Sequence, residues 1–148
     1  MKFIADGMLG GLARWLRFIG YDTLYFNTSR KIDFIRQAKK EGRIVLTKDR
    51  KLCKDFPGLV YFVNGENTLE QFKDVIKNFK IRIKEKDIFS LCSICNKKLE
   101  RIEKEKIKGQ IPEYIYLTKE KFSICPDCGR IYWDGDHCKR IKKVIKEI

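Results

Sequence analysis

The chain has 148 residues, and its 33 lysines and arginines against 20 aspartates and glutamates give a formal net charge of +13. Apolar residues make up 43%, which allows a folded core, but no stretch is apolar for long enough to cross a membrane. The positive charge attracts polyanions, of which RNA and DNA are the commonest in cells, although rich lysine and glutamate usage is also a trend of hyperthermophile proteins. The length suits one ordinary domain and a small metal-stabilised one.

The first 80 residues alternate between expected strands and helices. Apolar spacing of i, i+3, i+4 and i+7 marks the helices, and short apolar runs mark the strands. We expect strands at 3–5, 23–26, 44–47 and 59–63, and helices at 8–19, from about 32 to 42, and at 68–79. Strands separated by helices indicate a parallel sheet with right-handed crossovers, an α/β fold with three layers, α/β/α.

The remaining residues have a different character. Residues 80–86 form a charged connector, so we expect one domain over 1–82 and a second, a small C-terminal zinc ribbon, over 88–148. Within the second, the alternating charges of 100–108 favour a solvated helix. The basic tail, 138–148, is also expected to be helical.

Two C-x-x-C pairs, Cys92/Cys95 and Cys125/Cys128, carry the strongest local signal. Each pair offers two thiolates from one tight turn, and two such turns complete a tetrahedral zinc site. Disulfides or a redox motif are the alternatives. The first six residues reach a carboxylate before any long apolar region, so we expect no signal peptide and a cytoplasmic protein, where metal is favoured over disulfide.

Three carboxylates follow the expected strands at one edge of the sheet. Asp6 comes directly after the first strand, Asp49 after the third, and Asp33 opens the helix that follows the second. Ligands of parallel α/β sheets bind beyond the carboxyl ends of the strands. Clustered carboxylates would raise each other's pKa unless a cation lay between them, and an all-oxygen set suits Mg²⁺ or Mn²⁺. Such an ion supports phosphodiester hydrolysis.

Each of these carboxylates also has a structural alternative. Asp33 could cap its helix, and Asp6 or Asp49 could pair with Arg14 or Arg50. Asp22 precedes its strand and is expected to lie at the opposite edge with a structural role.

Basic residues near that edge are candidates for holding a nucleic-acid backbone. Arg14 and Arg17 share a face of the first helix, and Arg50 follows Asp49. They either grip phosphates or pair with acids of the same cluster. His137, the one histidine, could act as a general acid or base, contact RNA, or bind zinc with Cys138; we favour a surface contact with RNA.

Taken together, several segments resemble the PIN-like RNase domain at the C-terminus of the Mut-seven exonuclease. The resemblance spans almost the whole chain and rests on residues 3–10, 12–17, 20–22, 42–50, 92–96, 125–129 and 132–137. It implies a PIN-like nuclease domain followed by a zinc ribbon, with Asp6, Asp33 and Asp49 in the acidic positions. PIN enzymes usually have a fourth acid, for which Glu66 is a weak candidate, and Lys48 stands where the family often has arginine.

The leading hypothesis is a ribonuclease that uses Mg²⁺ or Mn²⁺ at the three aspartates, with Arg14, Arg17 and Arg50 holding RNA and zinc stabilising the ribbon. The alternative is a non-catalytic module that binds RNA or the ribosome. A toxin-like nuclease is a third, which the attached ribbon disfavours.

Overall fold

The structure is a computed structural model that describes residues 1–27 and 30–148, with the backbone alone for 136–138. The chain forms two compact units, Met1–Asn96 and Lys97–Ile148. In the described part of the chain, no helix combines the length and apolar character needed to cross a membrane.

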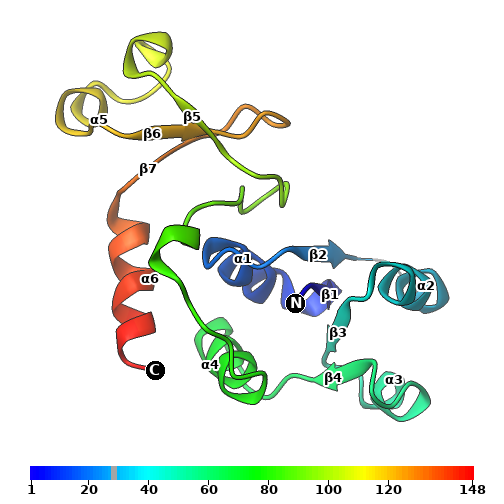
Figure 1. Cartoon of the computed structure of the whole chain (residues 1–148). Helices are drawn as coiled ribbons and strands as arrows, with labels where there is room; N and C mark the ends of the chain where they lie inside the picture. The colour runs from blue at the N-terminus through cyan, green and yellow to red at the C-terminus, as the bar shows by residue number, and fades with distance from the viewer. Residues whose placement is uncertain (28–29) are drawn as a thin grey trace. The chain divides into compact units, whose positions relative to one another are not determined.

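A parallel four-stranded sheet is the centre of the first unit (Figure 1). Its strands are β1 (Phe3–Asp6), β2 (Thr23–Phe26), β3 (Ile44–Thr47) and β4 (Val60–Phe62), in the order β2-β1-β3-β4. The register pairs Ala5 with Tyr25 on one side and with Leu46 on the other. The carboxyl ends of the strands therefore meet at one edge, as expected from the sequence.

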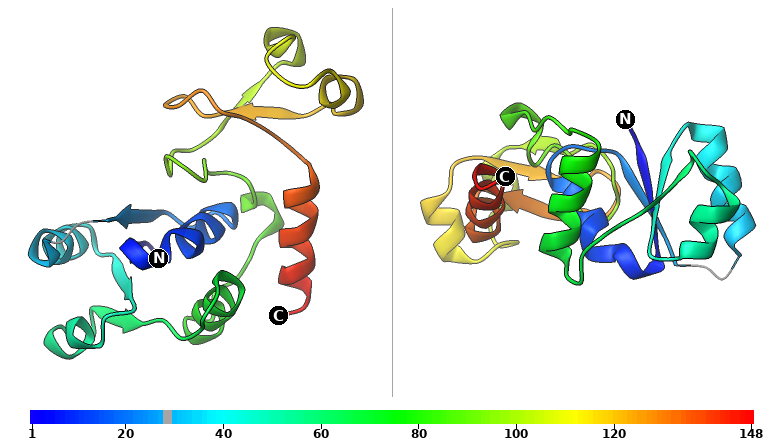
Figure 2. Two further views of the ribbon diagram at one scale, coloured as in Figure 1. Left: turned by 180° about the vertical axis from the view of Figure 1, so that it is seen from behind. Right: turned by 90° about the horizontal axis from the view of Figure 1, so that it is seen from below.

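Helices cover both faces of this sheet. They are α1 (Gly10–Phe18), α2 (Lys31–Glu41), α3 (Arg50–Asp55) and α4 (Thr68–Asn78). Figures 1 and 2 show α1 and α4 on one face and α2 and α3 on the other. The three-layer α/β/α architecture predicted from the sequence is confirmed.

Apolar side chains fill the space between the sheet and the helices on both faces of the sheet, and they bury β1. All four of its residues are buried, as expected of a central parallel strand. On one face Ile4 packs with Phe34 and Leu52. On the other, Trp15 of α1 meets Phe72 of α4 with ring centroids 5.1 Å apart. Trp15 is half-buried at this contact.

Most expected elements have nearly the predicted bounds, and α3 is the main omission. A 3-10 turn, Gly7–Leu9, separates β1 from α1, so the predicted helix begins later. Helix α2 ends at Gly42, whose φ of 66° lies in the left-handed region that glycine tolerates. Helix α3 has six residues, too few for a periodic signal.

Residues 80–86, which we expected to form a charged connector, belong to the first compact unit. Lys80, two residues past the end of α4, has a left-handed φ of 49°, and Ile81 and Ile83 are half-buried after it. A 3-10 turn follows, Glu85–Asp87, and the Phe89 N–H donates to the Phe18 carbonyl at 2.8 Å.

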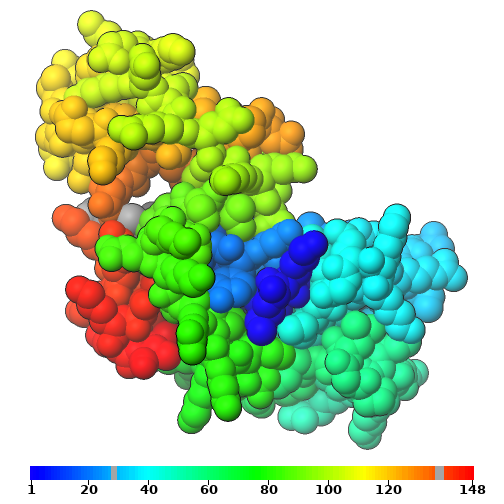
Figure 3. Space-filling model, in the orientation of Figure 1, coloured from blue at the N-terminus to red at the C-terminus, as the bar shows by residue number. Residues whose placement is uncertain are grey.

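Figure 3 shows the start of the chain at the surface, in dark blue.

The second unit contains a three-stranded antiparallel sheet, in the order β5-β6-β7. Its elements are β5 (Glu100–Ile102), α5 (Glu113–Thr118), β6 (Phe122–Ile124), β7 (Ile131–Trp133) and α6 (Asp136–Lys146), with a 3-10 helix at Lys104–Ile107. The helix predicted over 100–108 is wrong, because β5 pairs with β6 and Ile107 is 1% exposed. The predicted C-terminal helix is confirmed as α6.

Candidate active site and four-cysteine centre

Asp6 is the last residue of β1, and it is held by groups from three other places in the chain. Its carboxylate accepts hydrogen bonds from the Gly7 N–H at 2.7 Å and the Thr47 hydroxyl at 2.9 Å. Lys31 Nζ lies 2.6 and 2.7 Å from the two carboxylate oxygens. Burial by itself would raise the pKa of Asp6, but the bonds from Lys31, Gly7 and Thr47 outweigh it and lower the pKa. The carboxylate is therefore kept ionised.

Asp49 lies two residues past β3 and caps helix α3. Its Oδ1 accepts from the backbone N–H groups of Lys51 at 3.0 Å and Leu52 at 3.3 Å. Its own N–H donates to Thr47 Oγ1 at 3.0 Å, and that hydroxyl donates in turn to Asp6. Thr47 thus links the two aspartates that the sequence placed at this edge.

Asp33 lies in the first turn of α2, with a side chain 46% exposed. Its carboxylate pairs with Arg30 Nε at 3.1 Å and does not cap the helix. Among the described residues, only the four cysteines form a group of three or more ligand atoms mutually within 4.8 Å. The three aspartates follow elements that meet at one edge, but their oxygens are not gathered around one point.

Two of the groups at this edge were missed by sequence reasoning. Lys31 and Thr47, not Arg14 or Arg50, are the partners of Asp6. A threonine that ends a strand beside the first aspartate's strand is a usable signal, since parallel register brings it alongside. Lys31 gave no signal beyond its position before Asp33.

Cationic side chains surround Phe62, at the end of β4. The Arg50 guanidinium lies 4.1 Å from the ring centroid, and Lys48 Nζ lies 5.3 Å from it. Lys48 Nζ also donates to the Gly65 carbonyl at 2.6 Å. Arg14 is exposed on α1, and Glu66 is exposed after β4. The edge that carries Asp6 and Asp49 therefore also carries positive charge.

Arg17 is buried, whereas the phosphate-binding role expected of it requires an exposed side chain. It is 7% exposed, and its guanidinium donates to three backbone carbonyls. Nε reaches the Thr23 carbonyl at 2.8 Å, while Nη1 reaches those of Ser93 at 2.8 Å and Ile94 at 3.1 Å. Because its donors are used inside the protein, Arg17 joins α1 to the turn that contains the first cysteine pair.

Asn96 completes the attachment of this turn. Its φ of 62° is left-handed, its Oδ1 accepts from the Thr23 N–H at 3.0 Å, and its Nδ2 donates to Asp22 Oδ1 at 2.5 Å. Asp22 also pairs with Arg43 Nη1 at 2.8 Å. Burial would raise the pKa of Asp22, but the bonds from Arg43 and Asn96 lower it. The structural role expected of Asp22 is confirmed.

The four cysteines form a centre that can hold a structural metal such as zinc. Their sulfurs all lie within 4.8 Å of one another, which suits the separation of about 3.8 Å in a tetrahedral Zn–S₄ site. The N–H groups of Cys95 and Cys128 approach the sulfurs of Cys92 and Cys125 at 3.4 and 3.5 Å. None of the four forms a disulfide. The side chains of His137 and Cys138 lie outside the described residues.

Comparison with known proteins finds a matching family and a human relative. The model of the Mut7-C RNAse domain matches residues 1–145 of the chain. The human protein named "Exonuclease mut-7 homolog" is 35% identical over 101 residues, which cover 64% of this chain and 12% of the human protein. The chain thus spans a small part of that relative's length.

Proposed function

The chain belongs to the Mut7-C RNAse domain family, and on that premise we propose that it is a divalent-metal-dependent ribonuclease. The observation that supports this most is that Thr47 links the Asp6 carboxylate to the backbone N–H of Asp49, at the carboxyl edge of the sheet. This is the edge where parallel α/β sheets bind ligands.

The donor set supports a hard cation at Asp6 and Asp49. Carboxylate oxygens suit Mg²⁺ or Mn²⁺, and the Gly7 N–H and the Thr47 hydroxyl hold the Asp6 carboxylate independently of Lys31. When bound, such an ion supplies Lewis-acid stabilisation of the phosphate and an activated water. Asp33 joins the set only after its ion pair with Arg30 opens.

The protein's own residues have distinct roles in this proposal. Thr47 fixes the orientation of Asp6, and the cap of α3 fixes Asp49. Arg50, held against Phe62, binds a phosphate of the substrate, and Arg14 binds another from α1. Lys31 neutralises Asp6 and must move before a cation can bind there. We place the protein in the cytoplasm, where its cysteines remain reduced.

A second function, RNA binding without cleavage, is favoured by two observations. The three aspartates do not form a ligand group among the described residues, and Lys31 already neutralises Asp6. A site of this kind would still bind RNA through its cationic side chains.

Cleavage of labelled single-stranded RNA and DNA in Mn²⁺, in Mg²⁺ or without divalent ions separates the two functions. The zinc-loaded protein is compared with Asp6→Asn and Asp49→Asn, and Asp55→Asn serves as a matched control on an exposed carboxylate. Asparagine is also a good helix cap, so Asp49→Asn should keep α3. We expect metal-dependent RNA cleavage that falls about 100-fold or more in the two edge variants and is retained in the control.

The opposite result would favour the binding module. Equal background cleavage in all four proteins, together with tighter RNA binding by Asp6→Asn, would show that the carboxylates repel phosphates and do not hold a catalytic ion.

A further inference from the structure

A groove lies at the other edge of the sheet, at the amino ends of the strands. It has a volume of about 490 Å³ and is lined by Met1, Gly20, Tyr21, Lys80, Ile81, Arg82, Lys84 and Asp87. Met1 precedes β1 and Tyr21 precedes β2, whereas Asp6 ends β1. Since β1 has four residues, about 13 Å of strand separates the two edges.

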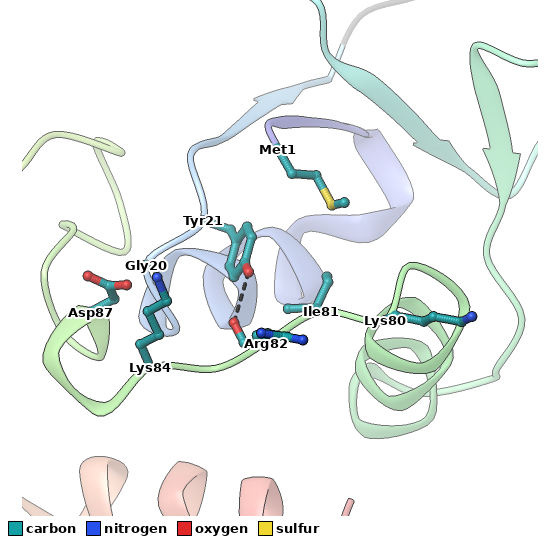
Figure 4. A pocket seen from close by; sticks show the side chains of 8 residues that line it. All are labelled: Met1, Gly20, Tyr21, Lys80, Ile81, Arg82, Lys84 and Asp87. Atoms are coloured by element: carbon teal, nitrogen blue, oxygen red, sulfur yellow. Dashed lines mark hydrogen bonds between the residues drawn. The ribbon is translucent and has the colours of Figure 1, made fainter.

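The charge of the groove is unbalanced. Three cationic side chains, those of Lys80, Arg82 and Lys84, line it against one carboxylate, that of Asp87. All three cations are exposed. Figure 4 shows the three side chains pointing in different directions, so that their charges do not converge on one point. Such an arrangement suits a chain of anions better than one small anion.

The backbone that carries these cations is held in place. The Tyr21 hydroxyl donates to the Arg82 carbonyl at 2.9 Å, as the dashed line in Figure 4 marks. The Ile81 N–H donates to the Ile76 carbonyl at 3.0 Å, and the Asp87 N–H donates to the Lys84 carbonyl at 2.9 Å. The segment is therefore fixed on both sides of Arg82.

Half-buried and exposed residues alternate along this segment, and the cationic residues are the exposed ones. Ile81 and Ile83 are half-buried, while Arg82 and Lys84 are exposed. In an extended chain, alternate residues are about 6.6 Å apart, which is close to the separation of successive phosphates in a single nucleic-acid strand. Arg82 and Lys84 thus lie on the same, exposed side of the segment, where one extended polyanion can contact both.

We propose that this groove binds the phosphate backbone of single-stranded RNA and holds the part of the substrate that extends away from the aspartate edge. The inference rests on the proposed ribonuclease function in taking RNA as the ligand. Contacts of this kind are with phosphates and carry no base specificity, so the groove adds affinity and not sequence preference.

The test is binding of a fluorescent 20-nucleotide RNA to the zinc-loaded full chain, without added divalent ions, over a series of salt concentrations. The groove variant is Lys80→Gln/Arg82→Gln/Lys84→Gln. The matched control removes the same charge from exposed residues of α2 and α3 on the other face of the sheet, with Arg36→Gln, Lys40→Gln and Lys54→Gln.

The groove variant should bind RNA about tenfold more weakly than the control, and its plot of log K against log salt should be shallower by about 2, as three lost phosphate contacts predict. Equal affinities and slopes for the two triple variants would overturn the proposal. An acidic peptide that binds more tightly than RNA through the same three side chains would also overturn it. Metal-dependent cleavage is a separate readout, so absence of cleavage would count against the proposed function and not against the groove.

Discussion

Replacing Arg17 by methionine should destabilise the first unit, since the guanidinium serves three backbone carbonyls. Methionine keeps most of the apolar stem but donates no hydrogen bond. A carbonyl left without its partner costs about 1 kcal/mol, so three give about 3 kcal/mol. Two of the carbonyls belong to Ser93 and Ile94, between the first pair of cysteines, so metal binding should weaken as well.

Urea unfolding followed by tryptophan fluorescence measures this loss. With a slope of about 1.5 kcal/mol per molar urea, 3 kcal/mol moves the midpoint by about 2 M. Co²⁺ substituted for zinc reports the cysteine centre through its thiolate absorption. Arg14→Met is the matched control, because Arg14 lies three residues earlier on the same helix and is exposed.

The two possible roles of Arg17 give opposite results. If Arg17→Met were as stable as Arg14→Met and lost only RNA affinity, the structural role would be refuted and the phosphate role restored.

Three further predictions follow from the ion pairs and the cysteine centre. Lys31→Met should bind Mn²⁺ about 2- to 10-fold more tightly by calorimetry, because a charge-assisted bond no longer competes with the ion, and Lys40→Met should show no such gain. The folded-state pKa of Asp22 is lowered, so its stabilisation is present above the unfolded pKa and lost as pH falls through the folded pKa. Asp22→Asn should therefore be less stable than wild type at pH 7 in urea titrations, and the gap should close below about pH 4; a gap independent of pH would contradict this. Removal of zinc with a chelator, or Cys92→Ser, should lower the melting temperature measured by calorimetry, and an unchanged melting temperature would show that no structural metal is held.

Much of the fold could be predicted because the first unit follows local rules. Buried strands such as β3 are short apolar runs, and α2 ends where Gly42 permits a left-handed turn. The six-residue α3 gives no periodic signal. The charged run at 100–108 misled the helix prediction because pairing with β6 overrides local charge pattern.

The candidate site could be predicted only in part, for a similar reason. The position of Asp6 and Asp49 after neighbouring strands follows from topology, and this was visible in the sequence. The partner of Asp6 was not, because Lys31 reaches it from a helix that begins 25 residues later. The burial of Arg17 depends on carbonyls 76 and 77 residues away, and no local pattern encodes such contacts.

The most direct test of the proposed chemistry is the rate of cleavage of one RNA as a function of Mn²⁺ concentration, for the wild type and for Asp6→Asn. If the carboxylate of Asp6 holds the ion, the wild type should show a saturable rise in rate, and the variant should stay near background at every concentration. A variant curve with the same midpoint and plateau as the wild type would contradict a metal-binding role for Asp6.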